Sequence, residues 1–276
     1  MTGWRPSRAA QLVDSLAPSA GRYYRQLRNE KAASNPHVGP FGIKLAGREG
    51  TGEWEEDKLR TFLACLDRSD LCVDVGANIG LYTCLAAVRK KRVIAVEPLP
   101  SNLLFLYRNL RYNMVETGVE VFPVGLSHRP GITRIYGKHD VASLVKGWAH
   151  EHDYYEDVPT IAMDRIIGKA FTGVQLTIKL DVEGSELEVL RGATETLDLD
   201  PKPFWIVEVF LNEPTDAGVP SLGKFKAVFD TFWSKGYRAK LITPSVREVD
   251  QADVDRWLEQ GSSADLGPSN FLFSEK

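Results

Sequence analysis

Five short, apolar-rich segments recur along this chain and constrain its fold more than any other feature. They occupy residues 71–75, 92–97, 119–124, 176–181 and 204–209. Apolar runs of this length are typical of strands buried on both faces of a sheet. Segments with helical spacing of apolar residues, such as 101–113 and 185–190, lie between several of them. Strands that alternate with helices predict an α/β fold, with a mostly parallel sheet covered by helices on both faces.

Further elements complete this pattern. Residues 55–66 and 81–89 are expected to form helices on either side of the first strand, and residues 225–235 a later helix. Residues 237–242 and 270–273 are expected to be two closing strands, which brings the sheet to seven strands. The turn signal HRPG at residues 128–131 is flanked by β-prone residues, so a hairpin-like excursion is expected within residues 121–136.

The composition is that of a soluble globular protein. Hydrophobic residues make up 43% of the 276 residues, charged residues make up 26%, and the formal net charge is −3. This balance excludes the overall positive field that nucleic-acid-binding proteins usually carry. Three cysteines without metal-ligand spacing are expected to be reduced thiols, and zinc is not expected. No apolar stretch is long enough to span a membrane or to act as a signal peptide, so we expect a cytoplasmic protein.

The N-terminal residues differ in charge from the rest of the chain. The first 31 residues contain six basic and two acidic side chains, a balance of +4, which leaves −7 for the remainder. Residues 34–40 are rich in turn formers. We therefore expect residues 1–40 to be a basic helical arm with a linker, and residues 41–276 to form one folded domain. The simplest interpretation of the arm is a solvated helix packed on that domain; binding of an acidic partner or gating of a substrate is the alternative.

A glycine-rich turn lies between the first strand and the helix after it. The turn spans residues 74–80 and reads DVGANIG, which lets the backbone turn tightly where a helix N-terminus presents free N–H groups. Glu97 ends the second strand, 21 residues after Gly76. A carboxylate at that place can accept hydrogen bonds from the two hydroxyl groups of a ribose. Together these features indicate a cofactor that contains adenosine.

The residues of the turn favour one cofactor over another. Dinucleotide-binding turns prefer G-x-G-x-x-G, whereas this turn has G-x-x-x-G preceded by Asp74. A carboxylate so near the cofactor would repel a pyrophosphate but attract a cation. S-adenosylmethionine carries a sulfonium and an ammonium group, and therefore fits that sign. The alternative interpretation of Asp74 is a strand-end residue that caps the following turn.

A second polar cluster follows the fourth strand and reads KLDVEGSE from Lys179 to Glu186. The period of two in a strand puts Lys179 and Asp181 on the same side, and Glu183 lies in the turn at the carboxyl end of the strand. Ligands of open α/β sheets bind at that edge, so we expect both clusters and Glu97 to meet at one crevice. Glu186 is alternatively an acid in the first turn of a helix, where it favours the helix dipole.

Three sequence blocks carry a resemblance to a known family. They are DVGANIGLYT at residues 74–83, VEP at 96–98 and KLDVEGSELEVLRG at 179–192, with supporting blocks at 124–127, 158–164 and 270–273. Together they resemble the signature blocks of the FkbM family of S-adenosylmethionine-dependent methyltransferases. The resemblance extends from residue 42 to residue 273 and departs from the family pattern at Gly125 and His128. It implies that residues 41–276 form a class I methyltransferase (Rossmann-like) domain that O-methylates a hydroxyl on a secondary metabolite or sugar.

The resemblance also implies roles for individual residues. Glu97 and the adjoining Pro98 would contact the ribose, and Leu126 with Ser127 the adenine. Glu55 matches an acidic position that precedes the first strand in similar proteins. The residues that would line the methionine part of the cofactor are Asp74, Gly76, Ala77, Asn78 and Gly80, and Asp181 is expected to adjoin them.

Methyl transfer from a sulfonium is an in-line displacement, and an alcohol is a poor nucleophile until its proton is removed. We expect Asp181 or Glu183 to take or share that proton, with Lys179 tuning the charge. Glu208, at the end of the fifth strand, is a further catalytic candidate in the same crevice. The less favoured alternative is a magnesium ion held by Asp181, Glu208 and Asn212.

Histidines offer another candidate base. His128, His139, His150 and His152 fall in a stretch with several tyrosines and a tryptophan that the strand pattern leaves outside the sheet. This stretch could form a lid over the acceptor, and one histidine acting as base is the main alternative to Asp181. Packing in a loop or at the surface is the simpler interpretation for each of them.

The sequence leaves three functions open. The first is O-methylation of a small-molecule or glycan hydroxyl. The second is methylation of RNA or protein, which the acidic net charge and the lack of an NPPY-like loop after the fourth strand disfavour; salt-dependent RNA binding by the arm would favour it. The third is a module that binds the cofactor without catalysis, and an NAD-dependent enzyme is a more remote fourth. The sequence does not indicate an oligomeric state.

Overall fold

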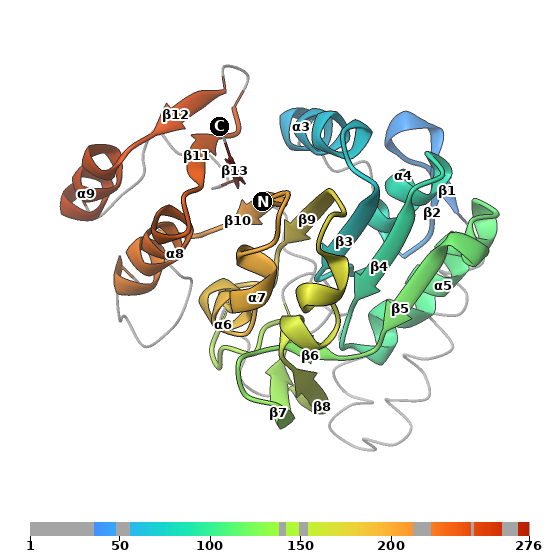
Figure 1. Cartoon of the computed structure of the whole chain (residues 1–276). Helices are drawn as coiled ribbons and strands as arrows, with labels where there is room; N and C mark the ends of the chain where they lie inside the picture. The colour runs from blue at the N-terminus through green and yellow to red at the C-terminus, as the bar shows by residue number, and fades with distance from the viewer. Residues whose placement is uncertain are drawn as a thin grey trace.

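The computed structural model describes residues 36–47, 56–137, 142–148, 154–211, 222–243, 246–260 and 270–275 of the chain (Figure 1). Residues 1–35 lie outside this part, so the helical arm and the boundary at residue 40 stay predictions. A small antiparallel pair comes first, formed by β1 (His37–Val38) and β2 (Lys44–Leu45) around the 3-10 turn η1 (Pro40–Gly42). The remaining elements belong to a central sheet, its covering helices and a smaller sheet.

An eight-stranded sheet forms the centre of the described part, in the order β12-β11-β13-β10-β9-β3-β4-β5. Its mutually parallel strands are β3 (Leu71–Val75), β4 (Arg92–Val96), β5 (Val119–Phe122), β9 (Leu176–Leu180) and β10 (Phe204–Glu208). Antiparallel β13 (Asn270–Ser274) lies between β10 and β11 (Arg238–Leu241). The expected α/β class is confirmed; β12 (Arg247–Val249), at one edge, adds an eighth strand to the seven expected.

Apart from β12, the strand order is the class I methyltransferase arrangement that the resemblance implied. The chain runs from β3 outward through β4 to β5, continues on the other side with β9 and β10, and closes with β11 and the antiparallel β13. The order therefore reverses between β3 and β9. Open α/β sheets bind their ligands at such a switch point, beyond the carboxyl ends of the strands.

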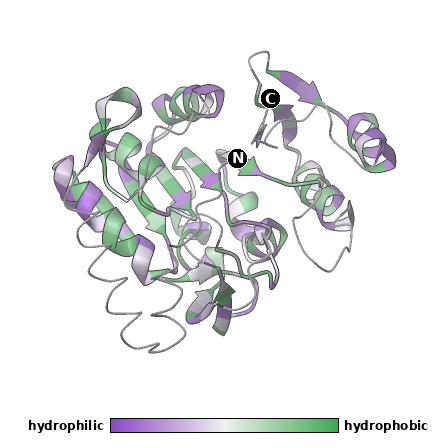
Figure 2. Ribbon diagram, turned by 180° about the vertical axis from the view of Figure 1, so that it is seen from behind, coloured by the Kyte–Doolittle hydropathy of each residue, from purple (hydrophilic) through white to green (hydrophobic). Residues whose placement is uncertain are grey.

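Helices cover both faces of the sheet, as expected. One face carries α3 (Glu56–Asp67), α4 (Leu81–Val88) and α5 (Pro100–Tyr112), and the other carries α6 (Glu186–Arg191), α7 (Thr194–Leu197), α8 (Leu222–Ser234) and α9 (Gln251–Gln260). Leu59 and Leu106 belong to the core on the first face, and Phe229 and Trp257 to the core on the second. The central strands are largely hydrophobic, whereas α9 and β12 present mostly hydrophilic residues (Figure 2).

A three-stranded sheet lies beside the main one (Figure 1). It contains β6 (Gly125–Leu126), β7 (Gly131–Tyr136) and β8 (Tyr155–Ile161). The hairpin expected within residues 121–136 is wrong in its pairing, because β6 and β7 both pair with β8 and not with each other. The sequence around the turn at residues 128–131 could not reveal this pairing, because β8 begins only at residue 155. Tyr136 also pairs with Ser143, which attaches residues 142–148 to this sheet.

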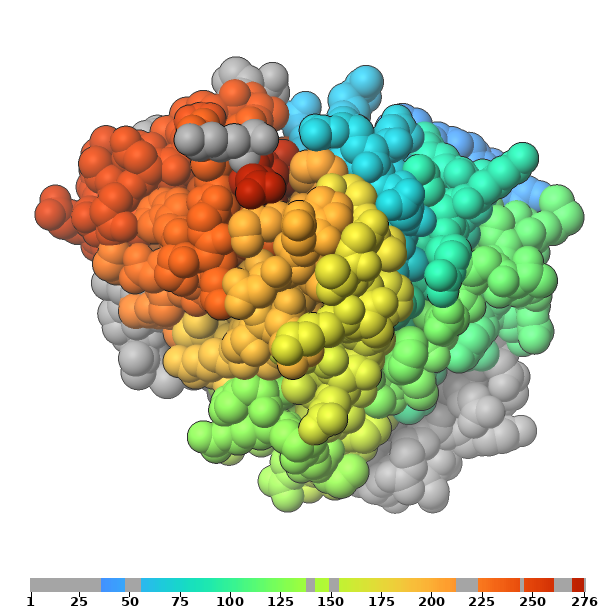
Figure 3. All heavy atoms as spheres, in the orientation of Figure 1, coloured from blue at the N-terminus to red at the C-terminus, as the bar shows by residue number. Residues whose placement is uncertain are grey.

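The segment from β8 to β9 crosses one face of the molecule between its first half and its last elements (yellow in Figure 3). It contains the 3-10 turns η4 (Met163–Arg165) and η5 (Gly168–Phe171). Met163 and Ile167 are buried in the same core as α6 to α9. This segment therefore completes the cover of that face of the sheet.

The cysteines are buried on the opposite side of the sheet. Cys65, Cys72 and Cys84 are all free, as expected. Burial raises the pKa of Cys65 to about 11 and the pKa of Cys84 to about 12, so these thiols stay protonated near neutral pH. Within the described ranges, no helix is long and apolar enough to cross a membrane.

Gly76 is the point where the turn after β3 meets the turn after β9. It has φ = 77°, and a Cβ built on it would lie 1.8 Å from the carbonyl oxygen of Asp181. The N–H of Asp181 donates to the carbonyl oxygen of Val75 at 3.1 Å. The resemblance placed this glycine along the methionine part of the cofactor. In the structure, the backbone of the neighbouring turn takes that space.

Replacing Gly76 with Ala should therefore destabilise the protein more than the positive φ alone requires. The left-handed conformation costs about 1–2 kcal/mol, and the clash with a backbone carbonyl should add about 1–3 kcal/mol. The matched control is Gly173→Ala, because Gly173 has φ = 85° and no atom near its absent Cβ. Chemical denaturation measures both variants, and equal losses of unfolding free energy would contradict the packing explanation.

Candidate functional site

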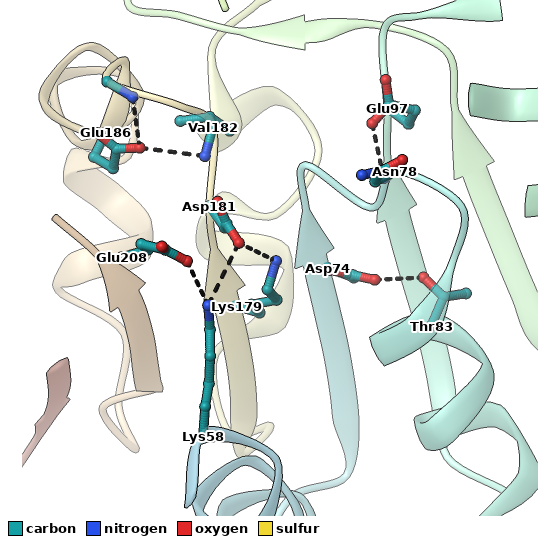
Figure 4. A network of polar contacts seen from close by, with 11 residues as sticks. Lys58, Asp74, Asn78, Thr83, Glu97, Lys179, Asp181, Val182, Glu186 and Glu208 are labelled. Atoms are coloured by element: carbon teal, nitrogen blue, oxygen red, sulfur yellow. Dashed lines mark hydrogen bonds and ion pairs between the residues drawn. The ribbon is translucent and has the colours of Figure 1, made fainter. Parts of the chain in front are cut away.

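Four polar side chains lie on one face at the carboxyl ends of three neighbouring strands. Asp74 of β3 is in register with Lys179 of β9, and Lys179 is in register with Ile206 of β10. Asp181 and Glu208 each follow two residues later on their strand, so the period of two keeps them on the same face. This is the face covered by α3 and α4, as Figure 4 shows. The convergence of these sequence-predicted residues at the switch point is thus found in the structure.

Two buried lysines link these carboxylates. Lys179 Nζ lies 2.9 Å from Asp181 Oδ2, and Lys58 Nζ lies 3.6 Å from the same oxygen. Lys58 also donates a hydrogen bond to Glu208 Oε2 (Figure 4). Both lysines are only 4% exposed. Because a buried charge needs a partner, breaking such a pair typically costs about 3–5 kcal/mol.

The lysines also set the charge of the central carboxylate. Burial raises the pKa of Asp181, but Lys179 and Lys58 outweigh it and hold the pKa well below its usual range. Burial lowers the pKa of Lys179, and the neighbouring charges of Asp181 and Asp74 raise it further than burial lowers it. Asp181 and Lys179 therefore form an ion pair across the whole neutral range.

The sequence analysis missed Lys58. It lies in α3, where it is buried together with the apolar residues Leu59, Phe62 and Leu66. A lysine on the apolar face of a helix that precedes the first strand is the signal that could have identified it.

Asp74 is fully buried at the end of β3. Its Oδ2 accepts a hydrogen bond of 2.6 Å from the hydroxyl of Thr83, in the first turn of α4. This contact agrees with the capping interpretation. The other carboxylate oxygen, Oδ1, has no hydrogen-bond partner in the structure. Burial raises the pKa of Asp74.

Glu97 fastens the glycine-rich turn to the end of β4. Its Oε2 accepts the N–H of Asn78 at 2.8 Å, and its Oε1 accepts the N–H of Leu99 and the side-chain amide of Asn102. Asn78 has φ = 51°, a left-handed conformation that this hydrogen bond supports. Burial raises the pKa of Glu97 to about 7, although the three hydrogen bonds favour its ionised form. The expected contact of Glu97 and Pro98 with a ribose stays a prediction.

The other predicted residues of the turn lie between the end of β3 and the start of α4. Gly80 has φ = 89° and precedes α4, and a Cβ on it would lie 3.2 Å from Leu106. The N–H groups of Gly76 and Ala77 both donate to the carbonyl oxygen of Val96. The turn therefore packs directly against the end of β4.

Glu183 lies in the turn after β9 and is held by residues from the 142–148 segment. Its Oε2 accepts the indole N–H of Trp148 at 2.7 Å, and its carbonyl oxygen accepts the hydroxyl of Ser143. Trp148 also packs on Gly184, where a Cβ would lie 2.3 Å from its ring, and on Phe210 at 5.5 Å between ring centroids. Burial and the nearby charge of Asp181 raise the pKa of Glu183 to about 8.

Glu186 lies in the first turn of α6, the position that the alternative interpretation gave it. Its Oε1 accepts the N–H groups of Val182 at 3.2 Å and Gly184 at 3.1 Å (Figure 4). It therefore fixes the turn between β9 and α6. Burial raises its pKa to about 8.

The remaining predicted residues are less informative. Leu126 is buried in the hydrophobic core, and the N–H of Ser127 donates to the carbonyl oxygen of Ile161. His128 Nδ1 lies 2.6 Å from Glu188 Oε2, and the guanidinium of Arg129 donates to His128 Nε2. The residues that lie outside the described part are Glu55, His139, His150, His152 and Asn212.

The carboxylates of this site do not fit the magnesium alternative. Lys58 places an ammonium group between Asp181 and Glu208, the two described residues of that ligand set. A divalent cation at the same place would face a fixed positive charge. Elsewhere in the described ranges, no three His, Cys, Asp or Glu side chains are arranged to hold a metal ion.

Comparison with known proteins decides the family. The model named Methyltransferase FkbM domain matches residues 74–239. The chain belongs to the FkbM methyltransferase family. The resemblance seen in the sequence is thereby confirmed. The matched FkbM region contains Asp74, Glu97, Lys179, Asp181 and Glu208, whereas α3 with its lysine precedes it.

Named relatives cover only part of the FkbM chain's length. The hexuronic acid methyltransferase AglP of Haloferax volcanii is 29% identical over 165 residues, 56% of this chain and 62% of that protein. The methyltransferase sdnD of Sordaria araneosa is 29% identical over 166 residues, 48% of this chain and 64% of that protein. The chain thus spans less than two thirds of either relative. Among solved structures, the SAM dependent methyltransferase of Agrobacterium tumefaciens has a TM-score of 0.45 at 10% identity, over 87% of this chain and 69% of that one.

Replacing Trp148 with Phe should raise the pKa of Glu183. The phenyl ring can still cover Gly184, but the indole N–H that favours the ionised carboxylate is lost. A hydrogen bond to a charged group is worth about 1.5–3 kcal/mol, so the pKa should rise by about one. Carbon-13 NMR of labelled glutamate carboxyls measures it, with Trp233→Phe on α8 as control. An unchanged or lower pKa would contradict the role of this hydrogen bond.

Proposed function

We propose that this FkbM-family protein transfers a methyl group from S-adenosylmethionine to a hydroxyl oxygen of a small molecule, with a sugar acid or sugar as the acceptor class. The observation that carries the proposal is the glycine-rich turn after β3, which the hydrogen bond from Asn78 to Glu97 closes at the switch point of the sheet. The family match supports methyl transfer. The name of the relative AglP, a hexuronic acid methyltransferase, supports the acceptor class.

The charges at the strand ends support a cationic cofactor. Asp74, Asp181 and Glu208 carry three carboxylates against the two ammonium groups of Lys58 and Lys179. Oδ1 of Asp74 has no hydrogen-bond partner, and a cationic ligand at the end of β3 would supply one and favour the ionised carboxylate. S-adenosylmethionine supplies an electrophilic methyl group on a sulfonium. In this proposal Asp74 and the turn at residues 76–80 hold its methionine part, and Glu97 its ribose.

Glu183 is the better candidate for the general base. A base works best when its pKa lies near the working pH, and the pKa of Glu183 is about 8. The pKa of Asp181 is held far lower by the two lysines, which makes it a weak proton acceptor. Glu183 is also only half-buried. We therefore assign proton removal to Glu183, and to Asp181 the ion pairs with Lys179 and Lys58.

A direct assay tests the function. Purified protein should be stabilised against thermal unfolding by S-adenosylmethionine but not by NAD, and should release S-adenosylhomocysteine with glucuronate or galacturonate conjugates as acceptors. Asp74→Asn should weaken cofactor binding about tenfold, since one charge facing the cation is lost. Thermal stabilisation without product from any hydroxyl acceptor would favour a binding module. Product formed only with RNA or protein would overturn the acceptor class.

The pH dependence tests the base. Glu183 must be ionised to accept a proton, so kcat/KM should rise about tenfold between pH 7 and a plateau above about pH 9. Glu183→Gln should lower kcat by about 10²-fold or more and abolish this rise. Glu188→Gln, at a half-buried position of α6 where the side chain pairs with Arg191 and His128, is the matched control. A pH profile that is the same in wild type and Glu183→Gln would rule out this role.

A further inference from the structure

The buried lysine of α3 lies outside the region that the family model matches. Lys58 precedes the matched residues 74–239, yet its ammonium group lies at the centre of the candidate site. It contacts Asp181 at the end of β9 and Glu208 at the end of β10. Its side chain is as deeply buried as that of Lys179. Figure 4 shows it extending from α3 toward the gap between the two carboxylates.

Two ionised carboxylates from neighbouring strands repel each other unless a cation lies between them or they share a proton. A divalent metal ion coordinated by both is one common solution. Here an ammonium group on the protein itself contacts an oxygen of each carboxylate. It supplies positive charge at the same place, together with a hydrogen bond to Glu208.

We propose that Lys58 is an internal cation that takes the place of a divalent metal ion between Asp181 and Glu208, and is the positioning residue for both carboxylates. Methyl transfer by this protein then needs no added metal. The expected effect on activity rests on the proposed function, whereas the expected metal binding depends only on Lys58, Asp181 and Glu208. A failure of the metal-binding prediction can therefore be distinguished from a failure of the proposed function.

Removal of the lysine should create a metal site. In Lys58→Ala the two carboxylates are left facing each other beside an empty space, and Mn²⁺ should bind there. The loss of free-ion signal in electron paramagnetic resonance measures the binding. We expect affinity about tenfold or more above that of wild type. Mn²⁺ should also raise the melting temperature of Lys58→Ala but not that of wild type, a comparison that works even if the variant is less stable.

Three variants give matched controls. Arg60→Ala removes a positive charge from the exposed side of the same helix and should behave as wild type. Lys58→Ala combined with Glu208→Gln lacks one ligand and should lose the gained Mn²⁺ affinity. Lys58→Arg keeps the charge and should bind no Mn²⁺.

The activity readout completes the test. Wild-type turnover should be unaffected by EDTA, whereas Lys58→Ala should lose about a hundredfold and regain part of it with Mg²⁺. If Lys58→Ala binds Mn²⁺ no better than wild type and is not stabilised by it, the inference is overturned. If wild type itself loses activity in EDTA, the inference is also overturned. New Mn²⁺ binding in a protein that methylates nothing would leave the inference intact and remove the proposed function.

Discussion

The need to pair two buried ammonium groups governs the arrangement of this site. Lys58 and Lys179 can be buried only because Asp181 and Glu208 lie within reach, and those carboxylates end neighbouring strands on the same face. The pairing ties α3 to β9 and β10, while the hydroxyl of Thr83 ties α4 to β3. The same ion pairs fix the protonation state of Asp181. The ion pairs at the strand ends therefore both hold these elements together and set the charge of the carboxylates.

The strands of the main sheet could be predicted closely, because each buried parallel strand is a continuous apolar run. The expected segment 71–75 and the observed β3 coincide, and β9 differs by one residue at its end. The short strand β12 was missed, since its three residues, Arg247–Val249, lack an apolar run. The pairing of β7 with β8 was missed for another reason. It depends on a partner far along the chain, which local patterns do not encode.

The site was predictable where a residue's position on a strand determined its place. Asp74, Lys179 and Asp181 converge as the period of two requires. Lys58 was missed because its importance comes from tertiary packing: its helix could dock in many ways on the sheet, and only one puts the ammonium between two carboxylates. The opposite pKa shifts of Asp181 and Glu183, two residues apart, were equally hidden. One carboxyl faces lysines and the other faces an indole and further acids, and neither environment is local in sequence.

The contact of Trp148 with Gly184 has a consequence for the diversity of such enzymes. Residues 142–148, which would cover the acceptor in the proposed function, contact the turn after β9 through Trp148. Its ring leaves no room for a side chain at residue 184. Replacing residues 142–148 with the segment of another protein would thus remove the side chains that pack against the turn after β9. A chimera meant to accept a new substrate must keep Trp148 and Ser143, or change them together with the turn that they contact. Under the proposed function, a change of acceptor through residues 142–148 would therefore also change the surroundings of Glu183.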